Sequence, residues 1–391
     1  MDKYRKFFGV VVICIFAVLF AKNIKDFKNT INIAINEKKE NPISYKSIFD
    51  NVEIQFKESL SDRNKWVDLY GEYQKILGNS IIGNFEYVLD QYGIIHMVSE
   101  DEAEKNINNF ISEIVKLKDI CKSINTPLLY IQAPNRECVN ENSAVTEFNV
   151  DNKVEDTLTN KLQKNTDVDV LDLRKMLNDS DRTFDLKDLF LHTDLHMQTD
   201  AEIWMAKKCV DYLALRFGFK IDNNKYLSDM SLYNKKIYPL LGSYGRTVGR
   251  KFTKIDSFTI YHPKEETNYT FTVPGDDSIY NVGTFDDIIL NGYENTETDE
   301  YTYWVTDFGQ FSRPIYRYTN NKSTGPKLLI ICDSIAYRAI SYMTLTCSEI
   351  TILDPRFFEG EDYLKIALED EYDAVLLWQG VYLMNIPYIV K

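Results

Sequence analysis

The sequence predicts an α/β fold in which a parallel sheet is covered by helices on both faces. Amphipathic stretches at 102–121 and 199–213 have helical spacing, and helix-sized stretches separate the runs near the end of the chain. Continuous apolar strands that alternate with helices are typical of a parallel sheet buried on both sides. Five short apolar runs supply these strands: 127–132, 168–173, 327–332, 349–353 and 373–378.

Other elements follow from local patterns. Residues 56–77 predict one or two amphipathic helices, and residues 87–97 predict a hairpin. Between 218 and 325 the alternation stops and Tyr, Thr, Asp and Asn become frequent. We expect this stretch to be a β-rich insertion of short strands and loops.

Two helix starts have capping-box spacing. Ser99 is followed by Glu102, and Thr199 is followed by Glu202. In such a box the hydroxyl and the carboxylate each accept a hydrogen bond from the first helical turn. We therefore expect Ser99 and Thr199 to cap the helices that follow them.

The N-terminus predicts a membrane anchor. An uncharged run at 7–21 follows a basic segment and precedes Lys22 and Lys25. About 15 residues form roughly 22 Å of helix, and snorkelling lysines can extend this toward the bilayer thickness of about 30 Å. The basic flank predicts an N-terminus inside the cell and a C-terminus outside. A cleaved signal peptide and a buried helix are the alternatives, although no small-x-small cleavage site stands out.

The predicted organisation has three parts. We expect a transmembrane signal anchor at 1–27, a polar spacer at 28–54 and one α/β domain at 55–391. The 391 residues are sufficient for a large core, and 44% of them are hydrophobic. The formal charge of −14 argues against general nucleic-acid binding. The six cysteines show no CxxC spacing, so we interpret them as small buried residues, with a Cys121–Cys138 bridge as the alternative.

The first candidate site lies where an apolar strand ends. Ile331-Cys332 is followed by Asp333, Ser334 and a helix. Active sites of α/β sheets lie at the carboxyl ends of strands, and a helix N-terminus favours an oxyanion. Ser334 is therefore a candidate nucleophile. The alternative is that Asp333-Ser334 only caps the helix.

The second candidate is the pair Asp194 and His196. Asp and His two residues apart can share one side of an extended segment. Asp can then orient His, and His can act as the base for a serine. His192, Asp194 and His196 also alternate as H-x-D-x-H, which leaves a metal site open, but no fourth ligand is visible. A solvated loop is a further alternative.

The third candidate is Leu241-Gly-Ser-Tyr-Gly-Arg246, where two glycines predict a tight turn. Arg246 and Tyr244 are candidate ligand-binding residues because an arginine can clamp an anionic or hydroxyl-rich group. A turn with a solvated arginine is an equally good interpretation.

Taken in chain order, these motifs resemble the DHHW proteins, which belong to the alginate O-acetyltransferase-like branch of the SGNH hydrolases. The similarity covers roughly residues 55–380. The stretches that carry it are SLSDRNKWVDLY with Arg63 and Trp66, YVLDQYGII, YIQAPNRE, TDLHMQTDAEIWMA, LLGSYGR, LLIICDSIA and TILDPR.

The resemblance implies an SGNH-hydrolase-like three-layer domain with a Ser-His-Asp triad. Carried over by motif, Ser334 is the nucleophile, His196 the base and Asp194 the orienting acid. Asp333, Tyr244, Arg246 and Gln379 remain candidates for substrate binding or the oxyanion hole. No metal or other cofactor is implied.

The activity implied is transfer of acetyl groups onto an exported or cell-surface polysaccharide, beside a membrane-bound O-acyltransferase that supplies the acetyl groups. A carbohydrate acetylesterase, or a glycan-binding or assembly protein with a degenerate site, are the alternatives. The sequence departs from the family pattern at Leu195 and Met197, where D-H-H-W has His and Trp, and at Cys332, where the family has Gly. None of these changes removes a triad member.

Overall fold

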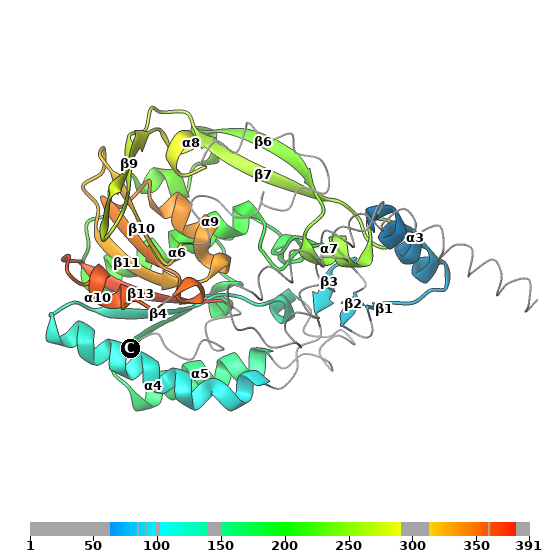
Figure 1. The fold of residues 1–391 in the computed structure, drawn as a ribbon, viewed down its shortest axis with the longest axis horizontal. Helices are drawn as coiled ribbons and strands as arrows, with labels where there is room; N and C mark the ends of the chain where they lie inside the picture. Colours follow the sequence, from blue (N-terminus) through cyan, green and yellow to red (C-terminus); the bar gives the residue numbers. More distant parts are fainter. Residues whose placement is uncertain are drawn as a thin grey trace, which may run out of the picture.

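The structure has three layers, with a central sheet between two groups of helices (Figure 1). The computed structural model describes residues 63–83, 86–90, 92–97, 102–139, 151–290, 313–358 and 360–380. The expected anchor at 1–27, the spacer at 28–54 and the Ser99 cap lie outside these residues. Within the described ranges no helix is both long and apolar enough to cross a membrane.

The central sheet has eight strands in the order β5-β4-β13-β11-β12-β10-β8-β9. The first five run parallel, as predicted. Each contains one of the five apolar runs: β5 Asp169–Asp172, β4 Leu128–Gln132, β13 Ala374–Gln379, β11 Lys327–Cys332 and β12 Glu349–Leu353.

The other three strands extend the sheet antiparallel beyond β12. They are β10 (Ile315–Asn320), β8 (Tyr269–Val273) and β9 (Asp276–Gly283). The stretch at 218–325 is β-rich as expected, but these strands join the central sheet rather than standing apart from it. Only β6 (Tyr233–Leu240) and β7 (Asp256–Pro263) form a separate two-stranded ribbon among the described residues of this stretch.

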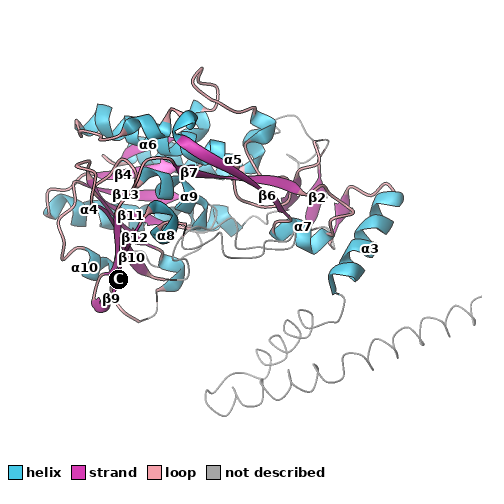
Figure 2. Cartoon of the chain, turned by 90° about the horizontal axis from the view of Figure 1, so that it is seen from above, coloured by secondary structure: helices cyan, strands magenta, loops and turns pink. Residues whose placement is uncertain are grey.

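Helices cover both faces of the sheet (Figures 1 and 2). One face carries α4 (Glu102–Ser123), α5 (Asp151–Asn165) and α10 (Tyr363–Ala367). The opposite face carries α6 (Thr199–Phe217) and α9 (Ser334–Met343). The two buried clusters share the strands because successive side chains of a strand point to opposite faces.

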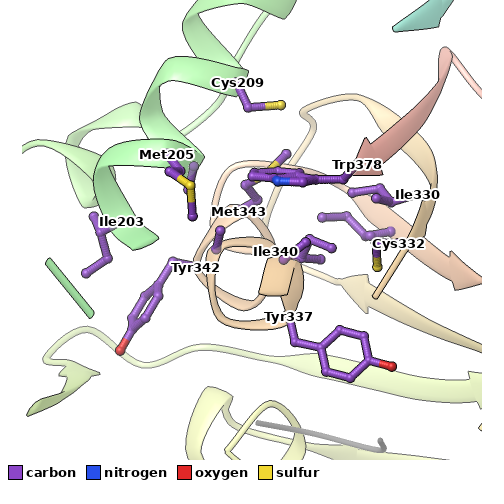
Figure 3. Close-up of a cluster of buried hydrophobic side chains, with 14 of the residues drawn as sticks. Ile203, Met205, Cys209, Ile330, Cys332, Tyr337, Ile340, Tyr342, Met343 and Trp378 are labelled. Atoms are coloured by element: carbon purple, nitrogen blue, oxygen red, sulfur yellow. The ribbon is translucent and has the colours of Figure 1, made fainter. Parts of the chain in front are cut away.

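The core beneath α6 and α9 contains aromatic, aliphatic and sulfur-containing side chains (Figure 3). Trp378 from β13 and Cys332 from β11 are fully buried there, together with Met343 from α9. Cys121, Cys209 and Cys347 are also buried, and all five described cysteines are free. The interpretation of the cysteines as buried hydrophobic residues is confirmed for these four, while Cys138 is half-buried.

A smaller unit lies beyond the ribbon (Figure 1). It contains α3 (Arg63–Ile76), the strands β1 (Ile81–Ile82), β2 (Tyr87–Leu89) and β3 (Ile95–Met97), and α7 (Ser243–Val248). The expected hairpin is the antiparallel pair β2–β3. Helix α3 packs against α7, and the Arg250 amide donates to Asp68 over 2.9 Å.

One capping prediction is wrong. The N-cap of α6 is Gln198, and its side chain makes no capping hydrogen bond. The Thr199 hydroxyl instead donates to the Thr259 carbonyl of β7 over 2.5 Å. A tertiary partner thus takes the hydroxyl that the local pattern assigned to the helix start.

Candidate active site

Ser334 is the first residue of α9 and directly follows the Asp333 cap at the end of β11. The Asp333 carboxylate is fully buried and accepts a hydrogen bond from the Ile335 amide over 3.1 Å. The structure therefore places Asp333 as the cap of α9, and its role in substrate binding or the oxyanion hole stays a prediction. Gly380, after β13, lies so close that a Cβ there would be 2.2 Å from Asp333 Oδ1.

Asp194 and His196 form a buried hydrogen-bonded pair. His196 Nδ1 lies 2.5 Å from Asp194 Oδ1, and the side chains of His196 and Asp194 are 2% and 0% exposed. The His196 amide donates to the same oxygen. A narrow turn holds the pair. The Leu191 amide donates to the His196 carbonyl, and Phe190 and Met197 form an isolated antiparallel β-bridge.

The second oxygen of Asp194 is bound by another segment. The Ser243 amide at the start of α7 donates to Asp194 Oδ2 over 2.6 Å. Burial alone would raise the pKa of Asp194, but the neighbouring His196 and the hydrogen bonds from His196 and Ser243 lower it well below its ordinary value. Asp194 is therefore ionised at any pH near neutrality and can stabilise a protonated imidazole.

Gly242 is required for this contact. A Cβ at Gly242 would lie 2.3 Å from Asp194 Cβ and 2.6 Å from the Thr193 carbonyl oxygen. The Gly242 amide donates to the Thr193 hydroxyl over 2.9 Å. The Thr193–His196 motif and the glycine-containing Leu241–Arg246 motif, predicted separately from the sequence, are thus one structural unit.

Tyr244 and Arg246 both lie on α7 and are partly exposed. The Tyr244 ring packs against Tyr87, with 5.5 Å between centroids, and against the Arg136 guanidinium at 5.3 Å. Gln379 is the last residue of β13 and pairs with Gln132 of β4. Substrate-binding roles for Tyr244, Arg246 and Gln379 stay predictions.

His192 and His196 do not share a hydrogen-bonding partner among the described residues. Its Nδ1 lies 3.0 Å from Asp256 Oδ1, and Asp256 also accepts from the His192 and Thr193 amides. No group of three or more His, Cys, Asp or Glu in the described part of the chain is arranged to hold a metal ion. His192 and His196 thus pair with different carboxylates, Asp256 and Asp194.

Arg338 of α9 connects the helix that begins with Ser334 to the turn that carries His196. Arg338, one turn after Ser334, donates through Nη2 to the carbonyl of Met197 over 2.5 Å and lies 3.2 Å from Glu202 Oε1. Among the described residues, however, Ser334 Oγ is hydrogen-bonded to Arg356 Nη1 at 3.2 Å and not to His196. The structure joins Asp194 to His196, and the contact of Ser334 with His196 stays a prediction.

The sequence analysis assigned no role to three buried or half-buried arginines, Arg136, Arg338 and Arg356, although the stretches YIQAPNRE and TILDPR contain the first and the last of them. Arg136 donates to the carbonyls of Ile95 and Leu191, both at 2.7 Å, and so ties the hairpin to the Asp-His turn. Arg136 and Arg356 each follow a buried strand within a few residues. An arginine just beyond the carboxyl end of a parallel strand is the signal that would have found them.

A polar cavity of about 660 Å³ lies beside the Asp-His turn. Its walls include Gln198, two residues after His196, and residues of β7. Hydroxyl, amide and carboxylate groups predominate, and such groups suit a hydroxyl-rich ligand. The lining residues are Arg182, Thr183, Phe184, Asp185, Asp188, Gln198, Asp200, Ser257 and Thr259.

Comparisons with solved structures confirm the predicted resemblance at the level of the fold. The chain is similar to PatB1 of Bacillus cereus, at 16% identity and a TM-score of 0.55, with 75% of this chain and 94% of PatB1 covered. PatB1 has also been solved with a sulfonyl adduct. A DHHW family protein from Eubacterium siraeum matches at 14% identity and a TM-score of 0.48, covering 75% of this chain and 92% of that one.

The O-acetyltransferase domain of Pseudomonas putida AlgJ matches at 10% identity and a TM-score of 0.41, covering 76% of this chain and 88% of that one. No protein-family model matches the sequence. No curated protein matches it either.

Proposed function

We propose that this chain is a serine O-acetyltransferase that modifies hydroxyl groups of an exported or cell-surface polysaccharide. The observation that carries the proposal is the buried Asp194–His196 pair, next to Met197, whose carbonyl accepts from Arg338 of the helix that begins with Ser334. The motif order and the fold shared with PatB1 support it.

The proposed reaction has two halves. His196 takes the proton of Ser334 while Oγ attacks the acetyl carbonyl carbon, and the leaving group of the donor departs with that proton. His196 then activates an acceptor hydroxyl, which attacks the acetyl-serine and frees Ser334. Asp194 stays ionised throughout and stabilises the imidazolium.

The proposed location is outside the cytoplasm, with residues 1–27 as a single-pass anchor. The apolar run at 7–21 and its basic flank support this topology. A membrane-bound O-acyltransferase is the proposed partner that supplies acetyl groups. This part of the proposal rests on the resemblance.

Ser334→Ala and His196→Ala test the proposed triad. Each should lower acetyl transfer from p-nitrophenyl acetate by several orders of magnitude, because nucleophile and base act as a unit. Ser341→Ala is the matched control, since Ser341 lies on α9 but its hydroxyl only donates to the Tyr337 carbonyl over 2.8 Å. Wild-type rates in both site variants would refute the triad. Product analysis with a glycan acceptor distinguishes an acetyltransferase from an acetylesterase. An acetylated glycan indicates the transferase, and free acetate alone indicates the esterase.

One observation favours a non-catalytic alternative, a glycan-binding protein. Ser334 Oγ is hydrogen-bonded to Arg356 rather than to His196. A sulfonyl fluoride tests this alternative, since PatB1 has been solved with a sulfonyl adduct. Labelling that disappears in Ser334→Ala rules out the binding-only function, and binding of glycans without labelling supports it.

A further inference from the structure

A clamped arginine reaches the oxygen of the proposed nucleophile. Strands β11 and β12 are parallel neighbours in which Ile331 pairs with Leu353. Their carboxyl ends therefore emerge side by side, and they carry Ser334 and Arg356 respectively. Arg356 Nη1 lies 3.2 Å from Ser334 Oγ.

Asp354 and Tyr337 hold the guanidinium in place. Asp354 is fully buried and accepts from Arg356 Nε at 3.0 Å and from Nη2 at 2.6 Å. The Tyr337 hydroxyl donates to the same carboxylate and lies 3.4 Å from Nη2. The Arg356 amide also donates to Asp354, so backbone and side chain share one anchor. Of the two terminal nitrogens, Nη1 faces the serine.

The protonation states of Arg356 and Tyr337 do not change near neutral pH. Burial disfavours the charged form of Arg356, but the hydrogen bond and charge of Asp354 outweigh it and raise the pKa of Arg356. Burial and Asp354 likewise raise the pKa of Tyr337. Arg356 therefore remains a cation and Tyr337 a neutral donor wherever an acetyl ester is stable enough to assay.

An arginine can only donate hydrogen bonds, so Ser334 Oγ is the acceptor in this contact. The hydroxyl hydrogen of Ser334 remains available for another acceptor, such as His196. When that proton leaves, the negative charge on Oγ already faces a positive donor, and charge-assisted hydrogen bonds are about twice as strong as neutral ones.

We propose that Arg356 is a catalytic residue that stabilises the negative charge developing on Ser334 Oγ during acyl transfer. The inference rests on the proposed serine chemistry. As Oγ attacks the acetyl carbonyl carbon of the ester donor, its proton passes to His196 and the carbonyl electron pair moves to the carbonyl oxygen. Arg356 gives and takes no proton, and it lowers the barrier by electrostatics alone.

The chain contains a close structural copy of this clamp for use as a control. At the end of β5, Asp172 accepts from the Arg174 amide, from Nε at 2.9 Å and from Nη2 at 2.7 Å. Arg174 also contacts Glu155 at 3.3 Å rather than a serine. Arg174→Met should therefore disturb the fold about as much as Arg356→Met without touching the nucleophile.

The test measures the rate of labelling of Ser334 by phenylmethanesulfonyl fluoride and the turnover of p-nitrophenyl acetate, with the full-length chain in detergent. Arg356→Met should lower both rates by about 10²–10³-fold, a loss comparable to that caused by removing one oxyanion-hole donor. Arg356→Lys keeps the positive charge but lacks the planar guanidinium. Its two rates should lie between those of the wild type and of Arg356→Met. Arg174→Met should leave both rates unchanged.

Two outcomes would overturn this inference and leave the proposed function intact. One is His196-dependent labelling that proceeds at the wild-type rate in Arg356→Met. The other is an equal loss of rate in Arg174→Met, which would make the effect structural. If wild-type Ser334 is not labelled at all, the proposed function fails and this inference fails with it.

Discussion

Asp194 uses both carboxylate oxygens, one for His196 and one for the amide of Ser243. The sequence predicted the first contact because Asp and His two residues apart can share one side of an extended segment. The structure forms the contact in a narrow turn instead. The second contact joins residues 49 positions apart. It depends on Gly242, whose missing side chain lets α7 approach the carboxylate.

Asp194→Asn should lower acetyl transfer by about 10³–10⁴-fold, because a neutral amide neither fixes the tautomer of His196 nor stabilises its cation. The fold should survive, since Asn has nearly the same shape. Turnover of p-nitrophenyl acetate measures the loss, and Asp286→Asn is the matched control, because Asp286 pairs with His262 Nδ1 at 3.0 Å outside the candidate site.

The pH dependence of stability gives a second readout of the same variant. The folded-state pKa of Asp194 lies below its ordinary value of 3.8. Its contribution is therefore complete well above that value and is lost as the pH falls through it toward the folded-state pKa. Melting temperatures between about pH 5 and pH 2 should fall less steeply in Asp194→Asn. Parallel curves for both proteins would contradict the assigned shift.

At the scale of elements, a buried ion pair joins α6 and α9. Glu202 on α6 and Arg338 on α9 are each 1% exposed and lie 3.2 Å apart. Burial raises the pKa of Glu202 to about 7, although Arg338 and His196 act to lower it. Such a buried pair need not add net stability, but losing one partner leaves an uncompensated charge.

Arg338→Met should destabilise the protein by about 3–5 kcal/mol, and adding Glu202→Met should recover much of that loss. Urea unfolding of the single and double variants measures this coupling. Lys251→Met removes one side of the exposed Lys251–Glu72 pair and should cost less than about 1 kcal/mol. Additive costs for Arg338 and Glu202 would show that the two side chains do not act as a pair.

At the scale of the whole molecule, the sheet is parallel where it supports the site and antiparallel where the stretch at 218–325 extends it. The same stretch supplies α7 and β7, which hold Asp194 and His192 from the side. A region that looked like an insertion therefore supplies contacts to Asp194 and His192 in the candidate site.

Removal of residues 1–27 tests the predicted anchor. The full chain should stay in the membrane fraction after alkaline extraction, since an apolar run of this kind inserts by burying its surface in lipid. The shortened chain, exported with a cleavable signal, should be soluble and keep its labelling by sulfonyl fluoride. A full-length chain that alkali releases would argue for a cleaved signal peptide instead.

The sequence by itself determined the five parallel strands, the helices at 102–121 and 199–213, the hairpin and the Asp194–His196 pair. These follow from side-chain periodicity or from residues a few positions apart, and both are local properties. Only the tertiary structure decided that β8–β10 extend the sheet, that Thr199 bonds to β7, and that Arg338 and Arg356 reach Met197 and Ser334. Those contacts depend on which strands become neighbours, and strand order is set by the packing of the whole core rather than by any local pattern.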